Sequence, residues 1–191
     1  MLLCAVVDQN RHPRQHDCSG YSAELSTPSQ ITLNEKDVCD LAEIYRETFT
    51  SYLTNLCSRA VQGMVENNVV AVVRDLDGKI VAVAMAEVAE ISLDGSAPLR
   101  IAEISEVSTH PLHQRRGLSR LACKKVVDRL RALNIHALFS ETRANHFAMM
   151  AVAYDSGLSP RGLLVQHCLI ASRFSEVVQQ TAFGDLIVFS L

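Results

Sequence analysis

The chain has 191 residues, of which 48% are hydrophobic and 20% are charged, and its formal net charge at pH 7 is −3. This composition is typical of one globular domain with a sizeable core, and it excludes an intrinsically disordered chain. The slightly acidic balance argues against a general nucleic-acid-binding protein.

Six cysteines are scattered along the chain, and none forms a Cys-x-x-Cys pair. They predict free thiols rather than a disulfide framework, and no residue spacing indicates a catalytic metal. The apolar start at residues 1–7 lacks a basic leader and is too short to cross a bilayer. We therefore expect a cytoplasmic protein with no membrane partner.

The first 30 residues differ from the rest. Residues 8–30 are polar and are interrupted by Pro13, Gly20 and Pro28, which predicts an irregular segment. We expect residues 1–30 to form an irregular N-terminal segment and residues 31–191 to form the folded domain.

Helical periodicity begins after Asn34, which together with Asp37 predicts an N-terminal cap. Apolar residues then recur at three- and four-residue spacing as far as Tyr52, and residues 58–67 predict a second helix. Further helices are expected over residues 117–133 and 145–156.

The strands are marked by apolar runs and turn residues. The sequence Asp75-Leu76-Asp77-Gly78 lies between two such runs, and Asp-Gly in this position is typical of a β-hairpin. Pro111 ends the third run. Strands are expected over residues 69–74, 79–89, 101–109, 137–141, 163–171 and 186–191.

The turn between the strand at 101–109 and the following helix reads Gln114-Arg115-Arg116-Gly117-Leu118-Ser119. Free amides and the helix dipole favour anions at a helix N-terminus, and a glycine lets the backbone approach the ligand closely. Seven Lys or Arg residues and one acid lie between Arg115 and Arg131. This stretch is either a solvated helix face or part of an anion site, so the sequence predicts a phosphate or pyrophosphate site.

With its surroundings, this turn resembles the acyl-CoA pyrophosphate loop of the GNAT superfamily of N-acetyltransferases. That loop reads Gln or Arg, two variable residues, Gly, one variable residue, then Gly or Ala. Gln114 and Gly117 match, and Ser119 replaces the last small residue. The resemblance covers roughly residues 31–191. It implies an α/β (α+β) fold, with a mixed β-sheet whose central parallel strands splay apart and are flanked by helices.

The resemblance also implies acetyl-CoA as co-substrate and a monomer or homodimer. The strand would bind the pantetheine arm through its backbone, the turn would bind the pyrophosphate, and Asn145 would either contact pantetheine or cap its helix. The residues expected to bind acetyl-CoA are Val107, Ser108, Thr109, Gln114, Arg115, Arg116, Gly117, Leu118, Ser119 and Asn145.

Three residues are candidates for proton transfer. Glu106 and Glu103 are candidate bases for the acceptor ammonium, and Glu106 is preferred because it lies closer to the loop. In a regular strand these two residues would point to opposite faces of the sheet. The alternative for each is that it has no role in catalysis and either takes part in a hydrogen-bond network or is exposed. Tyr154 is the candidate acid for the CoA thiolate. Tyr154 precedes Gly157 by three residues, whereas the tyrosine of the family precedes its glycine by four. One residue is a turn of about 100° on a helix, so the alternative is that the Tyr154 ring faces the core or solvent.

Within the superfamily, the chain is most similar to the β-lysine N6-acetyltransferase branch, at residues 45–52, 77–81 and 102–119. It departs from that branch at Met149-Met150 and at residues 184–189. The resemblance implies acetyl transfer to a primary amine of a small amino-acid-like or polyamine acceptor, by direct attack in a ternary complex. The alternatives are a protein N-acetyltransferase, a non-catalytic acyl-CoA-binding or sensing module, and a nucleic-acid contact by the basic stretch.

Overall fold

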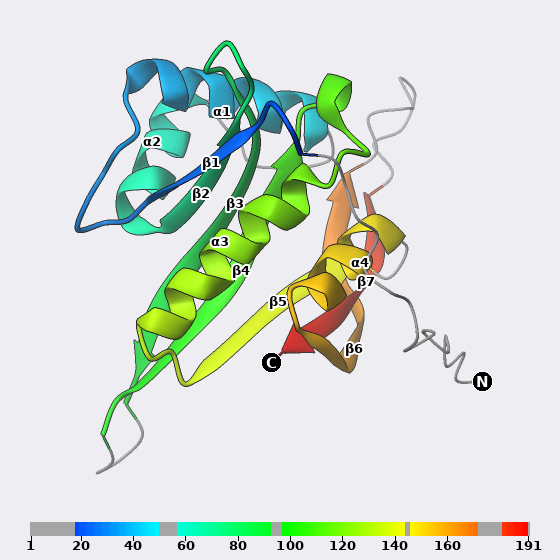
Figure 1. Cartoon of the computed structure of the whole chain (residues 1–191). Helices are drawn as coiled ribbons and strands as arrows, with labels where there is room; N and C mark the ends of the chain where they lie inside the picture. The colour runs from blue at the N-terminus through cyan, green and yellow to red at the C-terminus, as the bar shows by residue number, and fades with distance from the viewer. Residues whose placement is uncertain (1–17, 50–56, 93–96, 144–145, 172–180, 191) are drawn as a thin grey trace.

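The computed structural model of the chain describes residues 18–49, 57–92, 97–143, 146–171 and 181–190. No helix in these ranges has the length and apolar run that a membrane crossing requires. The elements in chain order are β1 (Ser22–Ser26), α1 (Glu35–Thr48), α2 (Ser58–Asn67), β2 (Val69–Arg74), β3 (Ile80–Ile91), β4 (Leu99–Thr109), the short 3-10 helix η1 (Pro111–His113), α3 (Leu118–Ala132), β5 (Ala137–Arg143), α4 (Phe147–Asp155), β6 (Ser159–Ala171) and β7 (Thr181–Ser190) (Figure 1).

All seven strands join one mixed sheet in the order β1-β2-β3-β4-β5-β7-β6. Among the described strands, only β4 and β5 pair in parallel, and their pairing covers residues 101–103 of β4 and 137–139 of β5. From Phe139 onward β5 pairs with β7 instead, so β4 and β5 diverge after a short shared stretch, as Figure 1 shows. The predicted mixed sheet with splayed central parallel strands is therefore confirmed.

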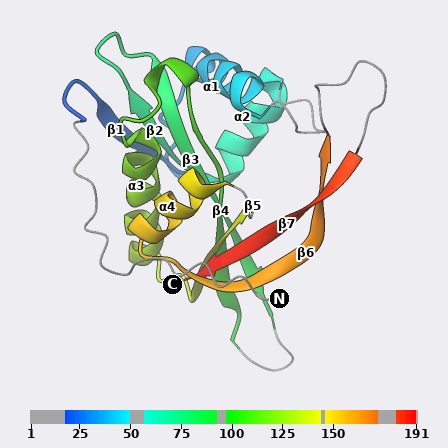
Figure 2. The same ribbon diagram turned by 90° about the vertical axis from the view of Figure 1, so that its right-hand side faces the viewer.

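Helices cover both faces of the first half of the sheet (Figure 2). Ala71 and Val73 of β2 pack in one hydrophobic cluster with α3, whereas Val70 and Val72 pack in a second cluster with α1 and α2. Because both faces are buried, β2 is a continuous apolar run rather than an alternating one.

Local capping signals explain where α1 and the first hairpin begin. The Asn34 side chain accepts a hydrogen bond from the Asp37 amide at 3.1 Å, and the Asp37 carboxylate accepts one from the Asn34 amide at 3.0 Å, which is a complete capping box. Gly78 closes the hairpin with a φ of 78°, a left-handed conformation that favours glycine. Helix α1 ends at Thr48 with Phe49 as its C-cap residue, one residue into the rest of its expected length, and residues 50–52 lie outside the described residues.

The expectation of an irregular segment is wrong for residues 22–26, which form β1 antiparallel to β2. Ala23 and Leu25 pack against the hydrophobic cluster that includes α3, and they alternate with polar residues. This alternation is typical of a half-buried strand, but it is too short, between Gly20 and Pro28, to predict a strand from the sequence. Arg74 of β2 holds this strand because it forms ion pairs with both Glu24 of β1 and the buried Asp37 of α1. Residues 1–17 lie outside the described residues.

Candidate active site

Strand β4 contains a β-bulge next to the predicted site. Met85 of β3 pairs with Ser105 and Val83 pairs with Ser108, so Glu106 and Val107 together lie opposite one residue of β3. Glu106 has a φ of 46°, a left-handed conformation that costs on the order of 1–3 kcal/mol for a residue other than glycine. The bulge interrupts the regular alternation of β4 at Glu106.

The same stretch of β4 is not paired with β5. The parallel pairing ends at Glu103, and the next carbonyl, of Ile104, accepts a hydrogen bond from the Ser140 hydroxyl at 3.0 Å. The backbone from residue 105 to 109 thus has a sheet edge that β5 does not occupy. Such an edge can bind an extended ligand through main-chain hydrogen bonds.

The predicted anion loop follows directly. Gly117 is the N-cap of α3, with a φ of 78° and no side-chain cap. The first turn of the helix is closed by a hydrogen bond of 3.0 Å from the Leu121 amide to the Gly117 carbonyl. The three preceding helix amides have no acceptor within the helix. Thr109 and Ser119 join the end of β4 to this turn through hydroxyl oxygens 2.6 Å apart.

A cavity of about 180 Å³ lies beside these amides. It is lined by Cys18, Gly117, Arg120, Leu121, Lys124 and Asp155. Arg120 and Lys124 are four residues apart on α3 and therefore lie on the same face of the helix. Their spacing within the basic stretch is the sequence signal that could have indicated their place in this cavity. Cys18 comes from a distant part of the chain and had no such signal.

The segment before β1 packs on the loop. The Tyr21 hydroxyl lies 3.1 Å from Nδ1 of His113, and the Arg116 guanidinium carbon lies 5.9 Å from the centre of the Tyr21 ring, within range of a cation–π interaction. The Cys18 thiol donates to the Arg116 carbonyl at 3.4 Å. Burial, helped by the neighbouring positive charges, lowers the pKa of His113, which favours the neutral ring in this hydrogen bond with the Tyr21 hydroxyl.

Four carboxylates on β3, β4 and β5 form an acidic group, in which Glu87, Glu106 and Glu141 lie within electrostatic range of Glu103. Glu87 and Glu103 are direct partners in the β3–β4 register. Burial raises the pKa of Glu103, and the negative charges of Glu141, Glu106 and Glu87 raise it further. This acidic group therefore brings the two predicted bases within electrostatic range of each other, and a raised carboxyl pKa suits a proton acceptor.

Glu103→Gln is expected to stabilise the fold at neutral pH. Because the folded pKa of Glu103 is raised above its unfolded value, folding favours the protonated form. Stability is therefore lost as pH rises from the unfolded pKa through the folded one. Thermal unfolding should give the variant a higher Tm than wild type at pH 7.5, and equal Tm values at pH 4 or below. An equal or lower Tm for the variant at pH 7.5 would show that Glu103 bears no such penalty.

Tyr154 and Asn145 remain predictions as site residues. Tyr154 lies near the end of α4, and its partly buried ring packs against the hydrophobic cluster that α3 covers. Asn145 lies outside the described residues. The cap of α4 is provided by His146, whose Nδ1 accepts a hydrogen bond from the Met149 amide at 3.1 Å.

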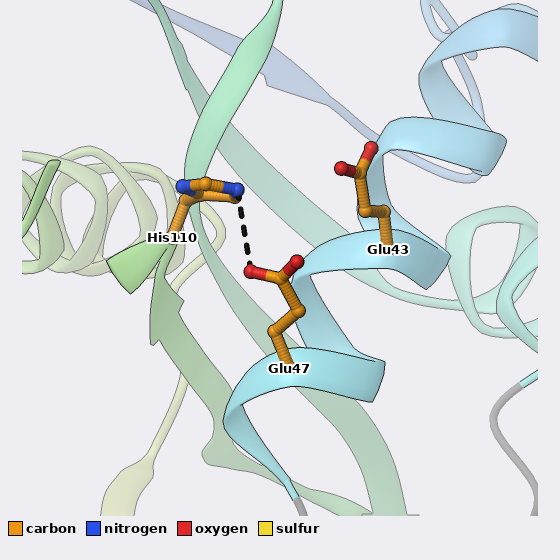
Figure 3. Close-up of side chains that lie close together, drawn as sticks. All are labelled: Glu43, Glu47 and His110. Carbon is orange, nitrogen blue, oxygen red and sulfur yellow. Dashed lines mark ion pairs between the residues drawn. The ribbon is translucent and has the colours of Figure 1, made fainter. Parts of the chain in front are cut away.

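Figure 3 shows Glu43 and Glu47 on α1 facing His110, which follows β4. Their ligand atoms lie within 4.8 Å of one another, so the group has the composition of a metal site. However, His110 Nδ1 accepts a hydrogen bond from the Leu112 amide at 3.3 Å. Its Nε2 therefore carries the hydrogen and faces a Glu47 carboxylate oxygen at 3.3 Å.

Glu43 is also occupied, since Lys79 lies 3.1 Å from its carboxylate. A metal ion would need the lone pair of His110 Nε2, which this tautomer does not offer. We interpret the group as a structural contact. With the bond from the Ser108 hydroxyl to the Thr48 hydroxyl at 2.6 Å, it fixes the last turn of α1 against the end of β4.

Comparison with known proteins agrees with this geometry. Residues 30–142 match the family model described as the acetyltransferase (GNAT) domain. Because this match covers more than half of the chain, the chain belongs to the GNAT acetyltransferase family. The class that the fold and the site define is therefore that of GNAT acetyltransferases.

Among curated proteins, the chain is similar to the N-acetyltransferase YodP of Bacillus subtilis, with 28% identity over 137 residues. That alignment covers 71% of this chain and 47% of YodP, so the chain spans about half the length of this relative.

Solved structures share the fold. YncA of Salmonella typhimurium, solved with its cofactor acetyl-CoA, has a TM-score of 0.66 at 17% identity, covering 90% of this chain and 93% of that one. Arabidopsis thaliana NAA60 in complex with acetyl-CoA has a TM-score of 0.67 at 14% identity, covering 90% and 97%. Spermidine N-acetyltransferase SpeG of Vibrio cholerae has a TM-score of 0.63 at 14% identity, covering 91% and 94%.

Proposed function

We propose that this domain transfers the acetyl group of acetyl-CoA to a primary amine of a small amino-acid-like or polyamine acceptor, by direct attack in a ternary complex. One observation carries the proposal: the unpaired, bulged edge of β4 leads directly into the uncapped N-terminus of α3. An extended acyl-thioester arm and an attached pyrophosphate need these two kinds of backbone site in this order.

The acetyl-CoA contacts are proposed from this arrangement. The backbone of Val107, Ser108 and Thr109 would hydrogen-bond the pantetheine arm along the edge that β5 leaves unpaired. The amides from Arg115 to Ser119 would hold the pyrophosphate. Arg115 and Arg116 are exposed next to these amides and would add positive charge.

Chemistry would take place at the bulge. An amide there would contact the thioester oxygen and stabilise the negative charge that develops on it. Glu106, with Glu103 as the alternative, would accept a proton from the acceptor ammonium, directly or through water. Tyr154 would return a proton to the departing thiolate.

The acidic group supports a cationic acceptor. Glu87, Glu103, Glu106 and Glu141 place negative charge beside the bulge, where an ammonium would be attracted and deprotonated. A polyamine offers a second positive charge to the carboxylates that are not the base. One structural neighbour is a spermidine N-acetyltransferase, which is consistent with this choice although the shared feature is the fold.

The first experiment is calorimetric titration with acetyl-CoA, with ATP and NADP as anionic controls. Selective micromolar binding of acetyl-CoA is expected. Amines would then be compared by thiol release, with spermidine, lysine and a peptide with a free N-terminus as acceptors. Equal responses to all three nucleotides would contradict the proposal. Turnover only with the peptide would favour a protein acetyltransferase, and binding without any turnover would indicate an acyl-CoA-sensing module.

Tyr21→Leu is expected to weaken acetyl-CoA binding about tenfold, because the ring that holds Arg116 and the hydroxyl that bonds His113 are both lost. A cation–π interaction contributes about 0.5–2 kcal/mol. Tyr21→Phe keeps the ring and should change the dissociation constant by less than about threefold. Calorimetry at two salt concentrations checks both variants. Equal binding by wild type and Tyr21→Leu would show that this segment does not support the loop.

A further inference from the structure

A second cavity, of about 200 Å³, lies at the other end of α3. Arg129 from the last turns of α3 and Arg100 from the start of β4 line it, together with Thr27 and Ser29 from the turn after β1. Arg129 follows Gly117 by twelve residues, so at 1.5 Å per residue it lies about 18 Å along the helix from the proposed acetyl-CoA loop. The cavity is therefore separate from the proposed reaction site.

Both arginines have a buried donor without an acceptor. The Nε atoms of Arg100 and Arg129 are inaccessible to solvent and have no hydrogen-bond partner among the described residues. Glu90 lies 3.6 Å from Arg100 Nε, beyond hydrogen-bond distance, and its side chain is 63% exposed. A buried donor on a charged group is costly when it lacks an acceptor, so two of them beside one cavity require an explanation.

The structural role of Arg100 uses only some of the hydrogen-bond donors of its guanidinium. Its Nη1 donates to the Leu133 carbonyl at 2.8 Å and so caps the C-terminus of α3. The neighbouring carbonyls of Arg129 and Leu130 accept bonds from the amides of Leu133 and Ile135. These helix carbonyls are thus occupied, which reduces the negative potential that a helix C-terminus would otherwise present to an anion.

Two further lining residues, Thr27 and Ser29, carry hydroxyl groups, and the remaining wall is largely apolar: Pro28, Asn67, Val69, Val88 and Leu133. The hydroxyl oxygens of Thr27 and Ser29 lie 3.1 Å apart, and the Thr27 residue is buried. One of these hydroxyls donates to the other, so the pair keeps one O–H group that can donate a hydrogen bond to a ligand oxygen. Two arginines and two hydroxyls oppose one mostly exposed carboxylate, so the charge of the cavity is positive.

We propose that this cavity binds a compact oxyanion, a carboxylate or a phosphate, between Arg100 and Arg129, with the Thr27–Ser29 hydroxyl pair as an additional donor. The planar guanidinium matches the two oxygens of either group, and a bound anion would offset the positive charge of both arginines. The cavity is large enough for a small anion, and its distance from the proposed acetyl-CoA site means that the anion would not be a reactant.

The test measures thermal stability of the whole chain in a chloride buffer at constant ionic strength, with added phosphate in one arm and malonate in the other. At about ten times its dissociation constant, a bound anion should raise Tm by about 4 °C. The arm that gives the shift at the lower concentration identifies the preferred oxyanion. No shift in either arm, or an equal shift with added chloride, would overturn the proposal.

Three variants locate the effect. Arg129→Gln should abolish the shift, and Arg131→Gln, which removes the same charge from an exposed position on the same helix, should keep it. Arg116→Gln, in the proposed acetyl-CoA loop, should also keep it. A shift kept in Arg129→Gln, or lost only in Arg116→Gln, would overturn the inference without affecting the proposed function. If Arg129→Gln does not fold, Thr27→Val serves in its place and should weaken the shift.

Discussion

Gly117→Ala is expected to weaken acetyl-CoA binding by about 100-fold, which corresponds to about 2.7 kcal/mol. The left-handed φ of Gly117 places the free amides of α3 toward the proposed ligand. A Cβ disfavours that conformation by roughly 1–2 kcal/mol, and it would also occupy the space through which the pyrophosphate approaches the backbone. Calorimetry with acetyl-CoA measures the loss.

Gly78→Ala is a matched control for this variant. Gly78 has the same φ of 78°, but it lies in the β2–β3 hairpin, where an added Cβ meets no atom within 4 Å. Both variants should therefore lose a similar amount of stability in urea unfolding, and only Gly117→Ala should lose binding. If both variants bind acetyl-CoA like wild type, the N-terminus of α3 is not the pyrophosphate site.

Glu106→Gln is expected to lower kcat by about 10²–10³-fold while leaving the dissociation constant of acetyl-CoA unchanged, because a positioned general base contributes an effect of this size. The variant keeps the shape of the side chain and removes its ability to take a proton. Thiol-release kinetics with the best amine acceptor, combined with calorimetry, separate turnover from binding.

Two other carboxylates of the acidic group provide the comparison. Glu87→Gln removes an equal charge from an exposed position in the acidic group and should change kcat by less than about threefold. Glu103→Gln should reduce kcat less than Glu106→Gln does. The reverse order would assign the base to Glu103, and normal turnover by all three variants would mean that none of these three glutamates serves as the base.

Much of the fold could be predicted because its signals are local. The capping box of Asn34 and Asp37, the Asp-Gly hairpin and the periodicity of α3 each depend on residues within a few positions of one another. The anion loop was predicted for the same reason, since Gly117 and the amides that follow it are contiguous. Strand β1 was missed because its five residues pack only once β2 is beside them.

The candidate site was predictable only in part. The sequence pointed to Glu103 and Glu106 as candidate bases, but the bulge between Ser105 and Ser108 is defined by pairing with β3. That pairing, together with β5, buries Glu103 and assembles the acidic group around it, and burial first and the neighbouring charges second raise the pKa of Glu103. A periodicity argument, which assumes a regular strand, does not capture either effect.

By itself, the sequence determined the class of fold, the order of most elements and the position of the loop before α3, because hydrophobic periodicity and backbone conformation are encoded over short distances. Only the tertiary structure decided what surrounds that loop. Tyr21 meets His113 across 92 positions and Cys18 meets Arg116 across 98. The two arginines beside the second cavity are 29 positions apart in the sequence. Such contacts arise from the packing of whole elements around a shared core, which no short stretch of sequence specifies.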